Sequence, residues 1–258
     1  MTHQYATVER DGPLTIITIN RPEARNALNA AAHVELAGIF DAFAADPEQW
    51  VAILTATGDK AFCAGQDLAA LADGAVLRPP PRGFGGLTSR FDLNKPIIAA
   101  VNGIAFGGGF ELALACDIIV AVESAKFGLP EPRVGLAALG GGIERLPRVI
   151  GLKRAMGMML TGKPVTANQG LELGFVNEVV ADDVLGAARR WAADILACSP
   201  MSVRATKEAV LRGMDTSLEE SAQTIWDYPA MVEMLASDDA AEGPKAFTEK
   251  RAPNWQGR

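Results

Sequence analysis

The chain has 258 residues, a formal net charge of −7 and three cysteines, and 49% of its residues are hydrophobic and 21% charged. These values are typical of a soluble globular protein with a substantial core, and the acidic balance argues against nucleic acid as the partner. The odd number of cysteines, without CxxC spacing, implies no disulfide framework. We therefore expect Cys63, Cys116 and Cys198 to be buried thiols in a reducing, cytoplasmic setting.

Neither a targeting segment nor a histidine-based metal site is indicated. Glu9, Arg10 and Asp11 interrupt the start of the chain, so no secretory signal is expected, and no apolar run is long enough to predict a membrane span. The two histidines, His3 and His33, are too isolated to form a metal site, and we expect both at the surface.

The first half of the chain alternates strands with helices. Residues 7–10 and 14–20 are β-branched runs on either side of Asp11-Gly12-Pro13, which predicts a hairpin. A helix is expected over 29–45, with Leu36, Ile39, Phe40 and Phe43 on its apolar face, and a strand over 50–55. This alternation favours an α/β class with largely parallel strands.

Residues 72–87 contain three consecutive prolines and four glycines without periodicity, and they predict a loop. A plain surface connection and a lid or wall of an acyl pocket are both compatible with this composition.

The stretch 95–131 is the most informative. Ile97 to Val101 predicts a buried strand, and Gly107, Gly108 and Gly109 follow it, before a helix expected to open at Glu111. Glycines at a helix N-terminus let a ligand lie against main-chain N–H groups. Such groups stabilise an oxygen that becomes negative, which is the property of an oxyanion hole.

Two glutamates are the candidate acid and base. Glu111 has apolar neighbours, and Glu131 lies twenty residues further on; the two converge if the strand over 117–122 runs back past the helix. Burial and a second carboxylate raise a carboxyl pKa, which provides an acid and a base from one residue type. Spacing alone leaves open that each glutamate lies at the surface or in an ion pair.

The last third becomes helical. Helices are predicted over 152–161 and 166–174, followed by a strand over 176–180. From about Asp182 three helical segments are expected without strands, which would cap the core or dock on a neighbouring subunit.

Several motifs together resemble the crotonase superfamily of enoyl-CoA hydratases and isomerases. They are RPEARNAL at 21–28, FCAGQDL at 62–68, VNGIAFGGGFELALACDI at 101–118 and FGLPE at 127–131. The resemblance implies an α/β crotonase-like spiral of ββα turns over residues 1–195 and a C-terminal α-helical trimerisation region over 196–258. It also implies a homotrimer or a dimer of trimers.

The same resemblance implies an enoyl-CoA hydratase-type lyase that adds water to a 2-enoyl-CoA. By position, the main-chain N–H groups of Gln66 and Gly108 match the oxyanion donors. Glu111 matches the residue that deprotonates water, and Glu131 the residue that exchanges the α-proton. No metal or redox cofactor is implied, because coenzyme A enters as part of the substrate.

Further contacts follow from the resemblance alone. Asp67 and Leu68 belong to the substrate-contacting turn, and the coenzyme A would lie near Arg25, Ala27 and Ala64. In the sequence AFTEKR, Phe247 and Lys250 match residues that reach the nucleotide from an adjacent subunit.

Within the superfamily, the ending AAEGPKAFTEKRAPNWQGR and the segment RGFGGLTSRFDLNKP look similar to the carnitinyl-CoA dehydratase (crotonobetainyl-CoA hydratase) branch. Its substrate carries a quaternary ammonium, for which Phe84, Trp226 and Tyr228 are conceivable walls. A non-catalytic crotonase-like binding protein is the remaining alternative. GxSxG, GxGxxG and P-loop motifs are absent from the sequence, which argues against serine hydrolases, dinucleotide enzymes and P-loop proteins.

Overall fold

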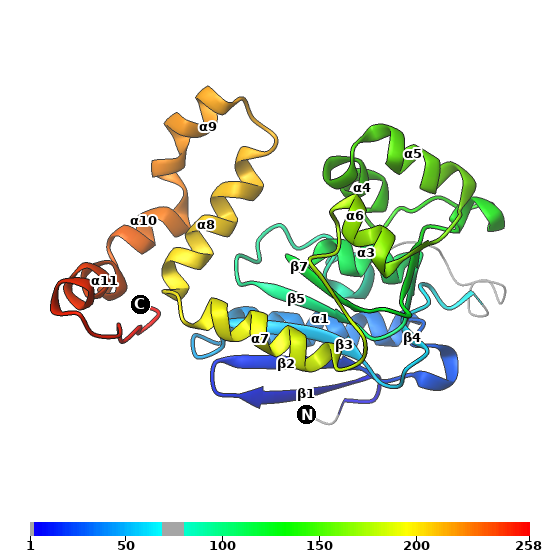
Figure 1. Cartoon of the computed structure of the whole chain (residues 1–258), viewed down its shortest axis with the longest axis horizontal. Coiled ribbons are helices and arrows are strands. Elements are labelled where there is room, and N and C mark those ends of the chain that lie inside the picture. The colour runs from blue at the N-terminus through cyan, green and yellow to red at the C-terminus, as the bar shows by residue number, and fades with distance from the viewer. Residues whose placement is uncertain (1–2, 69–79) are drawn as a thin grey trace.

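A computed structural model describes residues 3–68 and 80–258 (Figure 1). Two sheets form its centre. The six-stranded sheet has the order β1-β2-β3-β5-β7-β10 and the four-stranded sheet the order β4-β6-β8-β9. The strands are β1 Ala6–Asp11, β2 Leu14–Ile19, β3 Val51–Ala56, β4 Ala61–Cys63, β5 Ile97–Val101, β6 Ile104–Phe106, β7 Ile118–Val122, β8 Lys126–Gly128, β9 Val165–Thr166 and β10 Glu178–Val180.

The large sheet is covered on both faces. β1 and β2 form the predicted antiparallel hairpin, and every other pairing in this sheet is parallel. Alternate residues face opposite ways: Ile53 and Ile98 pack under α7 (Val184–Leu196), whereas Leu54 and Ala99 join the main core, which includes α1 (Ala30–Ala45). Burial on both sides explains why these strands read as continuous apolar runs.

The small sheet brings the sequence motifs together. β4 leads into the turn at 64–68, β6 into the glycine cluster and β8 into Glu131. Because β4, β6 and β8 are neighbouring parallel strands, their carboxyl ends lie at one edge of the sheet. The order of these strands therefore positions the site.

The remaining helices of the spiral agree closely with the sequence predictions. α5 spans Leu152–Thr161, and α6 (Ala167–Leu173) begins at Thr166 with a capping box to Gln169 and ends at Gly174. α4 (Gly142–Ile150) precedes them, and α3 (Gly108–Ala115) crosses below them (Figure 1).

The C-terminal region contains more helices than expected. Three segments were predicted after Asp182, but five helices are present, because Tyr228-Pro229 and Ser237 each start a new one. They are α7, α8 (Pro200–Gly213), α9 (Leu218–Thr224), α10 (Pro229–Leu235) and α11 (Asp238–Glu249). Whereas α7 lies on the sheet, α8 to α11 project from it as an arm (Figure 1).

The last residues fold back onto this arm. The buried carboxylate of Asp239 accepts hydrogen bonds from Ser199 Oγ and from the N–H groups of Gln256 and Gly257. Trp255 Nε1 donates to the carbonyl of Ala197 at 2.9 Å. The chain end therefore ties α11 to the junction between α7 and α8.

Across residues 3–68 and 80–258, no helix combines the length and the apolar character needed to cross a bilayer.

Candidate active site

A cavity of about 410 Å³ opens at the carboxyl ends of β4, β6 and β8. It is largely apolar, and Glu111 and Glu131 both line it. The other lining residues are Ala30, His33, Val34, Ala64, Gly65, Gln66, Leu68, Pro80, Phe84, Gly107, Gly108, Pro130, Arg133, Val134, Leu136, Ala137, Leu139 and Gly140.

Helix α3 presents its N-terminus to this cavity. It begins at Gly108, not at Glu111 as the sequence indicated, because Gly107 adopts φ 54° and turns the chain out of β6. The main-chain N–H groups of the first helical turn have no acceptor within the helix. At Gly109, an added Cβ would lie 2.0 Å from the carbonyl oxygen of Cys63, so the close approach of α3 to the end of β4 requires a residue without a side chain.

The turn after β4 holds Gln66 beside this helix. Leu28 donates to the carbonyl of Gly65 at 2.9 Å and accepts from the N–H of Asp67 at 2.9 Å. Leu28 makes both bonds of this parallel bridge, so the N–H of Gln66 points away from it. The two N–H groups expected to bind an oxyanion, those of Gln66 and Gly108, therefore belong to neighbouring segments that both line the cavity.

Glu111 is 3% exposed and held by backbone donors. Its Oε1 accepts from the N–H groups of Gly140 at 2.8 Å and Gly142 at 2.9 Å. Burial raises the pKa of Glu111 to about 7, with a smaller upward contribution from Glu131 and an opposing one from the two N–H donors. No pattern in the sequence analysis indicated that the glycines at 140 and 142 bind this carboxylate.

Glu131 starts the 3₁₀ turn Glu131–Val134, and its side chain points back toward α3. A Cβ added at Gly107 would lie 3.0 Å from Glu131 Oε1. Its other oxygen, Oε2, is buried and has no hydrogen-bond partner among the described residues. Burial raises the pKa of this carboxyl. An unpaired carboxyl oxygen beside a cavity is suited to a water molecule or a reacting group.

His33 is not at the surface, and that expectation is wrong. Its side chain is buried with the residue 6% exposed, and it contacts both the turn after β4 and the segment around Phe84. The signal was present in the sequence: His33 lies three residues before Leu36, on the apolar face of α1. The isolation of His33 from other potential metal ligands in the sequence argued against a metal site, but it did not predict whether the side chain is buried.

The remaining residues of the turn divide into two groups. Ala64 and Leu68 line the cavity, whereas Asp67 forms a 3.2 Å ion pair with Arg21 and fastens the turn to the N-terminal motif. Arg25 and Ala27 lie on that motif, outside the cavity wall, with the carbonyl of Arg25 accepting from Ala64 N–H at 3.1 Å.

Asn26 is a structural residue that sequence reasoning passed over. It is buried at φ 56°, and its amide donates to the carbonyls of Thr57 and Ala61. Its Oδ1 accepts from Arg21 N–H at 2.9 Å. These bonds hold the RPEARNAL turn against β4.

Phe247 lies on α11 and Lys250 directly follows that helix. Figure 1 shows α11 at the end of the arm, well separated from α3, whose N-terminus lines the cavity. Phe247 is 87% exposed. Of the aromatic residues considered as walls for a quaternary ammonium, Phe84 lines the cavity, whereas Trp226 and Tyr228 lie on the arm. One chain therefore does not assemble these three rings around one site.

The segment 72–87 falls partly outside the described residues, which resume at Pro80. Pro80 and Phe84 form part of the cavity wall, so the described portion is more than a surface connection.

All three cysteines are free, but the expectation of burial is confirmed only for Cys63; Cys116 is half-buried and Cys198 is exposed. Within residues 3–68 and 80–258, no group of three metal-ligating side chains is positioned to hold an ion.

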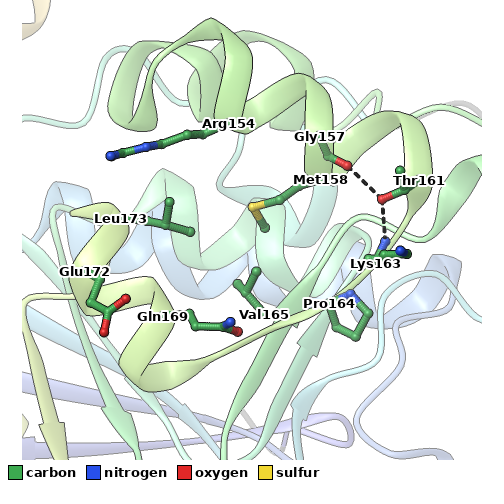
Figure 2. Close-up of a pocket in the computed structure, with 10 residues that line it drawn as sticks. All are labelled: Arg154, Gly157, Met158, Thr161, Lys163, Pro164, Val165, Gln169, Glu172 and Leu173. Atoms are coloured by element: carbon green, nitrogen blue, oxygen red, sulfur yellow. Dashed lines mark hydrogen bonds between the residues drawn. The ribbon is translucent and has the colours of Figure 1, made fainter.

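A second concavity, of about 640 Å³, lies between α5 and α6 (Figure 2). Its charged lining residues, among them Arg154 and Glu172, are exposed. Figure 2 shows the hydroxyl of Thr161, which donates to the carbonyl of Gly157 at 2.7 Å and accepts from the N–H of Lys163. The sequence-predicted catalytic residues all line the first cavity instead.

The model of the enoyl-CoA hydratase/isomerase family matches residues 9–258. The chain belongs to this family. This membership confirms the resemblance drawn from the four motifs, the crotonase-type fold and the class of enzyme, a hydro-lyase of the enoyl-CoA hydratase type.

Individual family members are similar over nearly their full length. The chain is 44% identical over 256 residues to a carnitinyl-CoA dehydratase of Salmonella arizonae, covering 96% of this chain and 97% of that protein. A probable enoyl-CoA hydratase/isomerase structure from Mycobacterium abscessus matches with a TM-score of 0.91 and 42% identity, covering all of both chains. A carnitinyl-CoA hydratase structure from Mycobacterium avium matches with a TM-score of 0.79 and 44% identity, also covering all of both chains.

Proposed function

We propose that this family member reversibly adds water to the double bond of a 2-enoyl-CoA thioester, with Glu111 and Glu131 as its catalytic pair. The observation that carries the proposal is one cavity that receives both carboxyls and the N-terminus of α3. Without a site for the thioester oxygen, the two carboxyls could not polarise the thioester carbonyl. Without the two carboxyls, the oxyanion site could not transfer protons.

The thioester oxygen accepts from the N–H groups of Gln66 and Gly108, which stabilise the enolate that develops on it. Glu111, whose anionic form is favoured by two N–H donors, takes a proton from water as the water oxygen bonds to the β-carbon. Glu131 gives its proton to the α-carbon. The cycle closes when the proton held by Glu111 returns to Glu131, and dehydration runs these steps in reverse.

Coenzyme A belongs to the substrate, and this chemistry requires no metal or redox cofactor. We place its nucleotide near the turn of Arg25, Ala27 and Ala64, with Asp67 holding that turn and Leu68 beside the thioester. Phe247 and Lys250 would reach the nucleotide of a neighbouring subunit, because they lie far from the cavity of their own chain. This arrangement is part of the proposal, together with a homotrimer or dimer of trimers and a cytoplasmic location.

The acyl group has two candidates. The carnitinyl-CoA dehydratase relatives favour a crotonobetainyl thioester, whereas the largely apolar wall favours a neutral 2-enoyl chain. Arg133 at the wall adds a positive charge that opposes a quaternary ammonium. Comparing kcat/KM for crotonobetainyl-CoA and crotonyl-CoA distinguishes them; a value at least tenfold higher for the charged substrate would favour carnitinyl-CoA dehydration.

The proposal is tested with E111Q and E131Q in a hydration assay that follows loss of the enoyl-thioester absorbance. Each variant should lose about 10²- to 10⁴-fold in kcat, because the amide can neither accept nor release the proton. Coenzyme A binding should change little. The matched control is E144Q, which alters an exposed carboxyl on the next helix and should remain active. Turnover near the parent value in either cavity variant would remove that residue from the mechanism.

A further inference from the structure

The imidazole of His33 connects three segments that meet at the cavity. Its Nδ1 accepts from the main-chain N–H of Gly85 at 2.9 Å, and its Nε2 lies 3.0 Å from Gln66 Oε1. The ring also packs edge-on against Phe84, with 4.7 Å between the ring centroids. Helix α1, the turn after β4 and the 3₁₀ turn at Phe84–Gly86 are therefore joined through one side chain.

These contacts fix the protonation state of the ring. A main-chain N–H can only donate, so Nδ1 is unprotonated and the proton of the neutral imidazole is on Nε2. Nε2 then donates to Gln66, which must present its amide oxygen. Burial lowers the pKa of His33, which agrees with a neutral ring.

Both proposed oxyanion donors depend on the segments that His33 connects. The N–H of Gln66 belongs to the peptide that joins Gly65 to Gln66. Gly65 adopts φ 97° and has no side chain to restrict the orientation of that peptide plane. The bond from His33 and the bridge to Leu28 supply that restriction. Phe84 lies directly on Gly108, where an added Cβ would be 2.4 Å from the ring.

We propose that His33 is a positioning residue of the oxyanion hole, which orients the N–H of Gln66 through its side-chain hydrogen bond and holds Phe84 against Gly108. The inference rests on the proposed function, because the donors matter only if a thioester oxygen becomes negative between them. It also gives the side chain of Gln66 a role, although the main chain of that residue supplies the donor.

The test uses H33N, Q66L and the double variant. Asparagine keeps an acceptor for the Gly85 N–H but is too short to reach Gln66, and leucine removes the acceptor from the opposite side. Loss of a whole oxyanion donor typically costs 10²- to 10³-fold in kcat, so misplacing one should cost about 10- to 100-fold, with KM changed less than about threefold. Because H33N and Q66L break the same hydrogen bond, the double variant should be no slower than the slower single variant.

A second readout does not depend on turnover. Acetoacetyl-CoA bound in an oxyanion hole is shifted toward its enolate, which has its own ultraviolet absorbance, and each variant should reduce the bound enolate fraction several-fold. The control is T15V, which breaks the buried 2.6 Å hydrogen bond to Gln49 away from the cavity. It should lower thermal stability and leave both readouts unchanged.

Parent-like kcat and enolate fraction in folded H33N or Q66L would overturn the positioning role, as would a double variant whose losses multiply. If H33N does not fold, Q66L reports on the same bond.

If the parent protein hydrates no enoyl-CoA, the proposed function is refuted. The bound enolate fraction of acetoacetyl-CoA, compared between the parent and each variant, still decides whether His33 orients the donors.

Discussion

At the scale of single residues, the chemistry depends on how each carboxyl is stabilised. Glu111 has two main-chain donors on one oxygen, whereas Glu131 has an oxygen without a partner among the described residues. The same residue type therefore occupies two different environments within one cavity. In the proposed mechanism, this difference separates Glu111 as proton acceptor from Glu131 as proton donor.

Burial of Glu111 carries a cost that depends on pH. Between its ordinary pKa of 4.5 and the folded value of about 7, the unfolded chain loses this proton while the folded protein keeps it. The free energy of unfolding therefore falls as pH rises through that window, by up to about 3 kcal/mol. Glutamine can accept the same two N–H bonds without ionising, so E111Q should be more stable than the parent at pH 8 and close to it at pH 4.5.

Urea denaturation of both proteins at pH 4.5 and pH 8, at one protein concentration, measures this effect. E172Q serves as the control, because Glu172 is exposed and is not among the groups that act on Glu111, so this variant should follow the parent at both pH values. A stability difference between E111Q and the parent that is the same at both pH values would contradict the assigned cause.

At the scale of elements, the glycines of α3 are required by contacts rather than by helix formation. Glycine is less favourable than alanine in a helix by roughly 1 kcal/mol, so its presence must be explained by what lies next to it. At Gly109 that neighbour is the main-chain carbonyl of Cys63, the last residue of β4, which cannot move aside as a flexible side chain would.

The substitution G109A should therefore destabilise the protein by about 1–3 kcal/mol or more, and it should lower kcat by moving α3 away from Gln66. The matched control is G38A in α1, where an exposed glycine has open space around it. That change should stabilise by about 0.5–1 kcal/mol. Thermal and urea unfolding of the two variants provide the comparison, and equal stabilities would show that the contact at Gly109 is easily relieved.

At the scale of the whole molecule, the arm formed by α8 to α11 leaves large apolar side chains exposed. Leu218, at the start of α9, is 88% exposed, and Trp226, in the 3₁₀ turn that follows α9, is 63% exposed. Several exposed apolar side chains on one projecting arm make it a candidate surface for contact with another protein chain. We expect it to carry the proposed subunit contact.

Replacing Leu218 and Trp226 together by lysine should reduce the assembly to smaller species in sedimentation velocity, because two buried charges would oppose association. Val8→Lys on the edge strand β1 is the control and should leave the sedimentation coefficient unchanged. An unaltered profile for the double variant would place the subunit contact elsewhere. Lower coenzyme A affinity in the smaller species would support the contribution of Phe247 and Lys250 across the interface.

The sequence by itself determined much of the local structure and indicated the candidate site. β-branched runs around a turn located the hairpin, the 3.6-residue period located α1, a continuous apolar run located β5, and helix-boundary residues located α5. The glycine triplet with Glu111 and Glu131 indicated the chemistry. All of these signals lie within short segments. The tertiary structure alone decided which segments meet: the Gly140 and Gly142 donors on Glu111, the burial of His33 and the contact of Phe84 with Gly108. These contacts join residues about 20 to 60 positions apart in the chain, and the order of strands in the sheets, which no local pattern encodes, brings them together.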